Sequence, residues 1–104
     1  MLKLTKVIIN NTNKYPSKRF IGIFNDDTRT YFGLKNPKYG TYIDHTDKLK
    51  RDSYNKRHEI DLKTKNPKKA GYLSMFILWN KKTLPASIKD YNTRLTTNTW
   101  TIPN

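Results

Sequence analysis

Three short runs in the first third of the chain are rich in β-branched and aromatic residues and partly alternate between apolar and polar positions. They cover residues 2–9, 18–24 and 28–34. Clusters of Asn, Asp, Pro and Ser separate the runs and are typical of turns. Three short strands with tight turns between them predict an antiparallel meander over residues 1–34. Within the second run, Gly22 indicates a place where two backbones approach closely.

The hydrophobic period changes after Gly40, and residues 44–62 contain neither Gly nor Pro. Oppositely charged side chains four residues apart support a helix here, at Asp47 with Arg51 and at Asp52 with Lys56. Asp44 or Thr46 is expected to cap this helix, with Asp47 in its first turn. The apolar stripe along the helix is weak, so the sequence predicts a polar surface helix.

Residues 70–82 are apolar nearly all round, which predicts a buried helix. Thr83 is expected to cap a further helix, and Pro85 is tolerated in its first turn. An amphipathic stripe follows at helical spacing, formed by Leu84, Ile88, Tyr91 and Leu95. In the tail, residues 96–104, Trp100 and Ile102 are expected to hold the chain against the body. The sequence thus predicts one α+β domain over residues 1–104: an antiparallel meander of about three strands, then three α-helices, two of them within residues 70–95.

Composition excludes several classes of protein. Aromatic residues make up 12% of the 104 residues, which argues against disorder, although hydrophobic residues reach only 35%. The absence of Cys excludes disulfides, thiolate zinc sites and Cys nucleophiles. No apolar run approaches the roughly 20 residues that span a bilayer, and the N-terminus lacks the apolar stretch of a signal peptide. We therefore expect an intracellular protein that is neither secreted nor inserted in a membrane.

Positive charge dominates the chain, with 21 basic and 8 acidic side chains and a formal net charge of +13. Residues 1–43 hold eight basic and two acidic residues, residues 44–62 hold five of each, and residues 63–82 hold six Lys and no acid. Two basic patches therefore flank a charge-balanced segment. The candidate nucleic-acid-binding residues are Lys63, Lys65, Lys68, Lys69, Lys81, Lys82, Arg51 and Arg57. A charge run of this kind can equally be a solvated loop that keeps the protein soluble.

So large an excess of positive charge destabilises a compact domain unless an anion is nearby, and nucleic acid is the commonest polyanionic partner of basic domains. Lys outnumbers Arg by 16 to 5. Because Lys contacts phosphate as a point charge whereas Arg forks read base edges, the composition favours binding without sequence preference. Four tyrosines near the Lys residues would either stack unpaired bases or form edges of the core: Tyr39, Tyr42, Tyr54 and Tyr72.

Residues 32–95 carry an ordered set of aromatic, His and basic positions. The set comprises Phe32-Gly33, Tyr39, Thr41, His45, Asp47-Lys48, Arg51, Tyr54, Arg57-His58, Ala70-Gly71-Tyr72, Ser74, Leu78-Trp79-Asn80-Lys81, Thr83-Leu84 and Ser87-Ile88-Lys89-Asp90. It resembles a family of small basic proteins of unknown function that are encoded by large double-stranded DNA viruses of algae and amoebae. The chain departs from the family at Met75-Phe76, where the family is more often basic and aromatic, and this departure favours a buried helix.

The resemblance implies a viral origin and a single-domain unit, and it implies no particular activity. With such an origin, the expected location is the virion or the host-cell cytoplasm, where viral factories assemble. DNA is then a better candidate partner than RNA.

Candidate catalytic groups are few. One set of residues resembles the paired strand motifs of GIY-YIG nucleases: Gly22-Ile23-Phe24 and Tyr31-Phe32-Gly33, with Arg51, Tyr54, His58 and Glu59 downstream. The spacing between the motifs is too short and Phe24 lacks the hydroxyl of the first motif, so we expect no enzyme and no catalytic residue.

His45 and His58 are the only histidines, and on one helix they would point apart, so no metal ion is expected. Nothing in the sequence indicates a cofactor or a small-molecule substrate.

One face of the predicted polar helix is open to two interpretations. On a helix, Arg51, Tyr54 and His58 would line one face, either as a phosphate-contacting or catalytic stripe or as a polar packing seam.

Two hypotheses for the function of the protein stay open. The first is a non-catalytic nucleic-acid-binding protein that acts on a viral genome or is packaged with it. The second is a minor capsid or scaffold protein whose Lys patches meet acidic surfaces of viral structural proteins. Both need only positive charge and a small rigid domain, so the sequence does not separate them.

Overall fold

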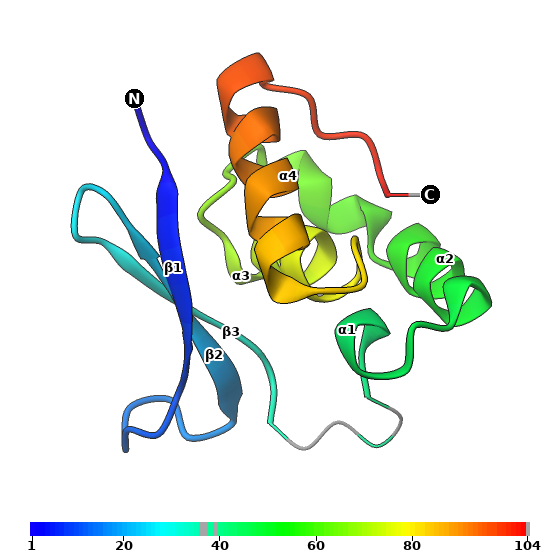
Figure 1. Ribbon diagram of the computed structural model, residues 1–104, viewed down its shortest axis with the longest axis horizontal. Helices are drawn as coiled ribbons and strands as arrows, with labels where there is room; N and C mark the ends of the chain where they lie inside the picture. The colour runs from blue at the N-terminus through cyan, green and yellow to red at the C-terminus, as the bar shows by residue number, and fades with distance from the viewer. Residues whose placement is uncertain (36–37, 39, 104) are drawn as a thin grey trace.

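The computed structural model describes residues 1–35, 38 and 40–103. Its N-terminal part is a three-stranded antiparallel sheet in the order β1-β2-β3, formed by β1 (Leu4–Ile9), β2 (Lys18–Phe24) and β3 (Arg29–Leu34). Strands that follow one another along the chain lie side by side in the sheet (Figure 1). This arrangement confirms the predicted meander.

A single buried side chain holds the loop between β1 and β2. Asn10 is 1% exposed, and its amide nitrogen donates hydrogen bonds to the carbonyl oxygens of Lys14, Tyr15 and Lys18 at 3.2, 3.1 and 3.0 Å. Tyr15 adopts a positive φ of 48° in this loop. The clamp places the Tyr15 ring beside β3, with its centroid 5.0 Å from that of Tyr31.

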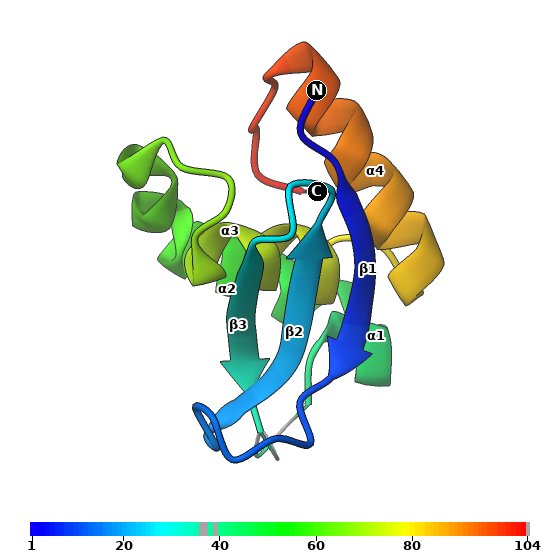
Figure 2. The same ribbon diagram turned by 90° about the vertical axis from the view of Figure 1, so that its left-hand side faces the viewer.

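Alternate residues of the strands divide the sheet into two faces. On the inner face, Phe20, Phe24 and Phe32 are buried against the helices. A Cβ atom at Gly22 would lie 3.2 Å from Leu73 Cδ1, so the sheet and the helical layer approach closely there. The prediction that two backbones approach at Gly22 is wrong, because the nearest atoms belong to the side chains of Leu73, Leu4 and Phe32. The other face of the sheet is turned away from the helices, which all lie behind it in Figure 2.

The helical part of the described chain follows β3. It consists of α1 (Tyr42–His45), α2 (Lys48–Arg57), the 3-10 helix η1 (Glu59–Thr64), α3 (Ala70–Leu73), the π-helical segment η2 (Ser74–Leu78) and α4 (Leu84–Thr97). The predicted α+β class, with a meander before the helices, is therefore confirmed. The prediction of three helices was too coarse, because the first two of them are interrupted.

The predicted polar helix over residues 44–62 is divided at two places. Thr46 takes a left-handed conformation with φ 55° and ends α1. Asp47 then caps α2, because its carboxylate accepts hydrogen bonds from two main-chain N–H groups of the first turn at 3.0 and 3.3 Å. The predicted caps, Asp44 and Thr46, belong to α1 instead. At the other end, α2 stops at Arg57 and the chain continues as η1.

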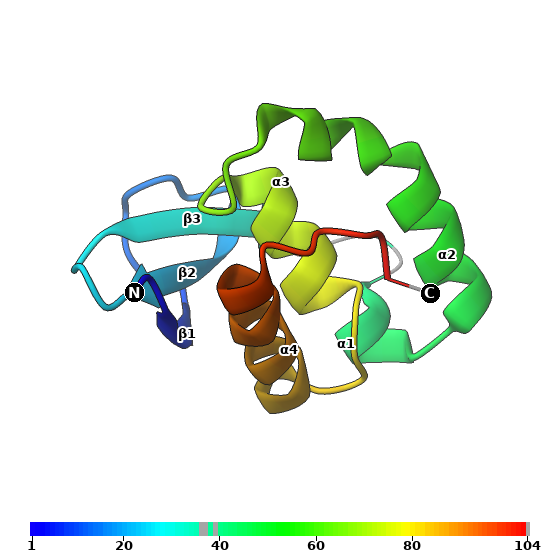
Figure 3. The same ribbon diagram turned by 90° about the horizontal axis from the view of Figure 1, so that it is seen from above.

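The segments α3 and η2 run through the middle of the molecule, between the sheet and α2 (Figure 3). Five of their side chains are at most 1% exposed: Leu73, Met75, Phe76, Ile77 and Leu78. The prediction of a buried helix over residues 70–82 is thus confirmed for residues 70–78. It is wrong beyond Leu78, because Trp79 leaves the helical conformation (φ −126°, ψ 33°).

The last helix begins where predicted and ends at Thr97, two residues inside the predicted tail over residues 96–104. Thr83 caps α4, since its hydroxyl oxygen accepts a hydrogen bond from a main-chain N–H of the first turn at 3.3 Å, and Pro85 lies in that turn. Tyr91, in the middle of the predicted stripe, is fully buried. The ring centroid of Trp100 lies 5.1 Å from that of Phe76, which fastens the tail to the core. Among the helices of the described chain, none combines the length and hydropathy that a membrane span requires.

Candidate nucleic-acid interface

Arg51 was predicted to contact nucleic acid, but the structure places it inside the fold. The residue is 7% exposed. Its Nη1 donates a hydrogen bond to the carbonyl oxygen of Asn80 at 3.2 Å, and its Nε donates to Asp52 at 3.0 Å. The guanidinium also lies 5.0 Å from the ring centroid of Tyr42. Arg51 therefore holds α2 against the bend that follows η2, and its guanidinium is turned into the fold and not to solvent.

The same bend is held from its other side by α4 and the tail. The amide nitrogen of Asn80 and the Nε of Arg94 both donate hydrogen bonds to Asp90 Oδ2, the latter at 2.7 Å. Arg94 also donates to the carbonyl oxygen of Thr101 at 2.8 Å. Burial by itself would raise the pKa of Asp90, but the hydrogen bonds from Arg94 and Asn80 outweigh it and lower the pKa. These bonds connect the bend to α4 and α4 to the tail.

A third arginine joins the sheet to the helices. Arg19 on β2 donates one hydrogen bond to each carboxylate oxygen of Asp44 in α1, both at 2.8 Å. These bonds hold the pKa of the Asp44 carboxyl well below its usual range. Three of the five arginines, Arg19, Arg51 and Arg94, are thus occupied in ion pairs within the fold. The other two, Arg29 and Arg57, are exposed.

The predicted Lys run over residues 63–69 is not uniform. The Nζ of Lys68 donates a hydrogen bond to Asp26 Oδ2 at 2.7 Å, and this contact lowers the pKa of Asp26. Lys68 therefore braces the β2–β3 turn. Lys63, Lys65 and Lys69 are exposed. They form the part of this run that can meet an external anion.

The remaining predicted residues lie elsewhere on the molecule. Lys81 and Lys82 are exposed in the connection before α4, at the opposite end of the α3–η2 segment from Lys69. Arg57, at the end of α2, lines an open groove of about 460 Å³ together with Trp79. The predicted residues are thus spread over three places and form no single patch.

A stack of rings accounts for the face shared by Arg51, Tyr54 and His58. The ring of Tyr54 lies between His58 and Trp79, with centroid distances of 4.1 and 4.2 Å. Both faces of Tyr54 are therefore covered, and burial raises the pKa of its hydroxyl. This geometry is a packing seam and leaves neither face of the Tyr54 ring open to a base.

The other candidate tyrosines and the two histidines can also be placed. Tyr42 and Tyr72 are buried in the core, and Tyr39 lies outside the described residues. The prediction that His45 and His58 share one helix is wrong: His45 is the last residue of α1 and His58 is the C-cap of α2. Within the described residues, no three His, Asp or Glu side chains come close enough together to hold a metal ion.

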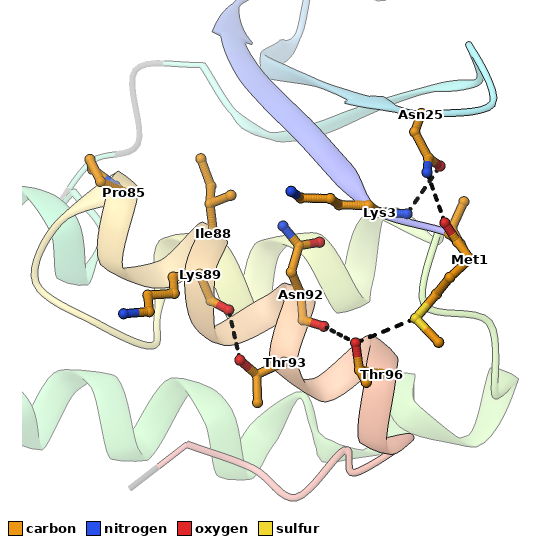
Figure 4. A pocket seen from close by; sticks show the side chains of 10 residues that line it. Met1, Lys3, Asn25, Pro85, Ile88, Lys89, Asn92, Thr93 and Thr96 are labelled. Carbon is orange, nitrogen blue, oxygen red and sulfur yellow. Dashed lines mark hydrogen bonds between the residues drawn. The ribbon is translucent and has the colours of Figure 1, made fainter.

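An open surface groove lies between the start of β1 and α4 (Figure 4). It has a volume of about 780 Å³. The Asn92 side chain lines it but is occupied, because it accepts a hydrogen bond from Leu4 N at 2.8 Å and donates one to Leu4 O at 2.9 Å. The Asn25 side chain likewise bonds the main chain of Lys3. This groove is best described as the seam by which β1 packs on α4.

One further surface, the outer sheet face, is not predicted by the sequence pattern. We use this name for the residues on the side of the sheet away from the helices: Lys6, Ile8, Ile21, Ile23, Arg29 and Tyr31, together with Lys14 and Tyr15 from the adjoining loop. Arg29 and Tyr31 alternate with Thr30 and Phe32 along β3, and this alternation was the available clue. It does not tell which of the two faces the helices cover.

Comparisons of this chain with protein-family models, with curated proteins and with solved structures find no significant match of any kind. The resemblance to viral proteins and the nuclease-like strand motifs therefore remain predictions from the sequence.

Proposed function

We propose that this protein binds nucleic acid through its phosphates, without recognising base sequence. It acts as a non-catalytic protein of a large DNA virus, located in the virus particle or in the host-cell cytoplasm, with DNA as its partner. The minor capsid or scaffold role remains the competing function.

The observation that supports this proposal is how the two basic residue types are used. Three of the five arginines are engaged in ion pairs within the fold. Every Lys except Lys18 and Lys68 is exposed. The net charge of +13 is therefore presented to solvent mainly by ammonium groups. An ammonium group attracts any phosphate but lacks the fixed fork that reads a guanine edge.

Binding of this kind has a characteristic dependence on salt. Each phosphate that a Lys neutralises releases a condensed counterion, so the logarithm of the affinity falls linearly with the logarithm of the salt concentration. The affinity rises with the number of phosphates contacted and depends little on which bases the strand carries.

The test is fluorescence anisotropy with labelled oligonucleotides of equal length and different sequence, single-stranded and duplex, over a salt titration. We expect affinities that agree within about threefold between sequences and fall steeply with salt. A preference of more than about tenfold for one sequence would contradict the proposal. Failure to bind DNA at low salt would also contradict it.

A polyglutamate of matched charge separates nucleic acid from an acidic protein partner. If the protein recognises nucleic acid, it binds polyglutamate more weakly than an oligonucleotide at the same salt concentration. Equal affinity for the two polymers would overturn the proposal and favour the capsid or scaffold role.

A further inference from the structure

The outer sheet face carries basic and aromatic side chains beside an apolar floor that is itself covered, since Ile21 and Ile23 are only 2% and 8% exposed. Ile21 on the central strand lies between Ile8 of β1 and Tyr31 of β3, its direct cross-strand neighbours. Two positions along β2, Ile23 lies between Lys6 and Arg29 in the same way. The apolar row formed by Ile8, Ile21 and Tyr31 thus lies next to a second row, in which Lys6 and Arg29 stand on either side of Ile23.

This register depends on an irregularity in β1. The pairing of β1 with β2 shifts between Leu4 and Lys6, and Thr5 lies at the shift. The Thr5 hydroxyl donates a hydrogen bond to the carbonyl oxygen of Ile23 at 2.8 Å. As a result Leu4 points into the core, while Lys6 lies opposite Ile23 on the outer sheet face.

Two tyrosine rings stand at the edge of the apolar row. Tyr15 is 56% exposed, and its ring is tilted by 59° against that of Tyr31. The Nζ of Lys14 lies 5.6 Å from the ring centroid of Tyr15 and 5.8 Å from that of Tyr31. The Lys14 cation therefore lies over both rings and adds positive charge directly at them.

The charges on this face have no opposing charge on the sheet. Neither Asp nor Glu occurs in β1, β2 or β3. Lys6 and Arg29 flank the same residue, so their Cα atoms are about 10 Å apart across the strands. Two copies of the chain meeting at this face would bring their cations together, which disfavours a dimer. A polyanion with flat apolar groups complements both the charge and the rings.

We propose that the outer sheet face binds unpaired bases of a single-stranded nucleic acid, an inference that rests on the proposed function. Tyr15 and Tyr31 stack bases, and Lys6, Lys14 and Arg29 contact the phosphates between them. Every base has a flat π face, so stacking of this kind adds affinity without adding sequence preference. It also makes the protein prefer single strands to duplexes, whose bases are stacked on one another.

The first experiment separates bases from phosphates. Anisotropy is measured with an oligothymidylate of about 12 nucleotides and with an abasic oligomer that has the same number of phosphates. The full-length protein is expected to bind the oligothymidylate at least about tenfold more tightly. Tyr15→Leu, at an exposed loop position, lowers that ratio by at least about threefold, and Tyr15→Leu with Tyr31→Leu brings it close to one.

The second experiment locates the phosphates with two variants of equal charge change. The sheet variant is Lys6→Gln/Lys14→Gln/Arg29→Gln, and the matched control is Lys63→Gln/Lys65→Gln/Lys69→Gln. Because each single-strand contact contributes about 0.7 to the salt slope, the sheet variant should lower the slope by about two and the control by less than one. The reverse order would overturn the inference and assign the contacts to the loop.

The outcomes distinguish this inference from the function on which it rests. Equal and salt-dependent binding of the two oligomers by the unmodified protein would overturn base stacking and keep the proposed function. Binding of neither oligomer at low salt would overturn the proposed function itself. If the double tyrosine variant does not fold, the unmodified protein is cross-linked by light to an oligomer that contains 5-bromodeoxyuridine. Cross-links at Tyr15 or Tyr31 support the inference, and cross-links confined to other segments overturn it.

Discussion

Replacing Arg51 with Met tests whether a predicted surface cation is a structural residue. Met fills part of the same space but removes the guanidinium, so the Asn80 carbonyl loses its donor. A hydrogen bond from a charged donor is worth about 1.5–3 kcal/mol. The cation over the Tyr42 ring adds about 0.5–1 kcal/mol. The pair with Asp52, whose side chain is 41% exposed, adds at most about 1 kcal/mol. After partial compensation by the buried Met, we expect Arg51→Met to lower the free energy of unfolding by about 2–4 kcal/mol.

Unfolding is followed in urea and by heating, with tryptophan fluorescence as the signal. Trp79 and Trp100 both pack against core aromatic rings, so their emission reports the loss of the core. For a domain of this size, the expected change corresponds to a fall in Tm on the order of 10–20 °C. The matched control is Arg57→Met at the exposed end of the same helix, for which we expect a change within about 0.5 kcal/mol.

DNA binding by the two variants, measured well below either Tm, completes the test. Arg51→Met should leave the salt slope unchanged, because the guanidinium does not reach the surface. Arg57→Met lowers the slope by at most about 0.7. An Arg51→Met protein with an unchanged Tm and a reduced salt slope would refute the structural role that we assign to Arg51.

Three further predictions concern stability. The pKa of Asp44 is lowered in the folded state from its usual 3.8, mainly by its hydrogen bonds with Arg19, so this contribution is present above about pH 4 and is lost as the pH falls below it. Asp44→Asn should therefore lower Tm at pH 7, and its difference from the unmodified protein should shrink towards pH 2 in acid titrations; a constant difference would contradict this. Trp79→Ala should cost about 3–5 kcal/mol in urea unfolding, and an unchanged Tm would show that Trp79 serves an interface. Raising NaCl from about 20 to about 300 mM should raise Tm by screening self-repulsion while it weakens DNA binding, and a falling Tm would show that the ion pairs outweigh the repulsion.

The sequence predicted the elements whose pattern is local. The strands and α4 are predicted correctly because the period of their hydrophobic residues and the turn or capping residues at their ends lie within a few positions of each other in the sequence. The break between α1 and α2 was missed, because Asp44, Thr46 and Asp47 are all acceptable caps. In the structure the N-cap of α1 is Thr41, Thr46 ends α1 in a left-handed conformation, and Asp47 alone of the three begins a helix.

The candidate site was harder to predict, since it depends on partners far away in the chain. Lys68 and Asp26 are 42 positions apart, and Arg51 and Asn80 are 29 positions apart. A count of charges along the sequence therefore gives the strength of the positive field but not which cations are occupied within the fold. The outer sheet face was missed for a similar reason: β2 carries the run Phe-Ile-Gly-Ile-Phe, which is apolar on both faces. Which face the helices cover is decided by packing alone.

The division between arginine and lysine explains how a small domain tolerates so much positive charge. A guanidinium has several donors in a fixed plane, so Arg19, Arg51 and Arg94 each bond an acceptor in a segment other than their own. An ammonium group on a long flexible stem is easily kept hydrated, and nearly all the lysines are exposed. The charges that hold the fold together are thus largely distinct from the charges available to a ligand. Because of this separation, we expect that surface lysines can be replaced in sets of three without unfolding the protein, so that loss of binding is measured apart from loss of structure.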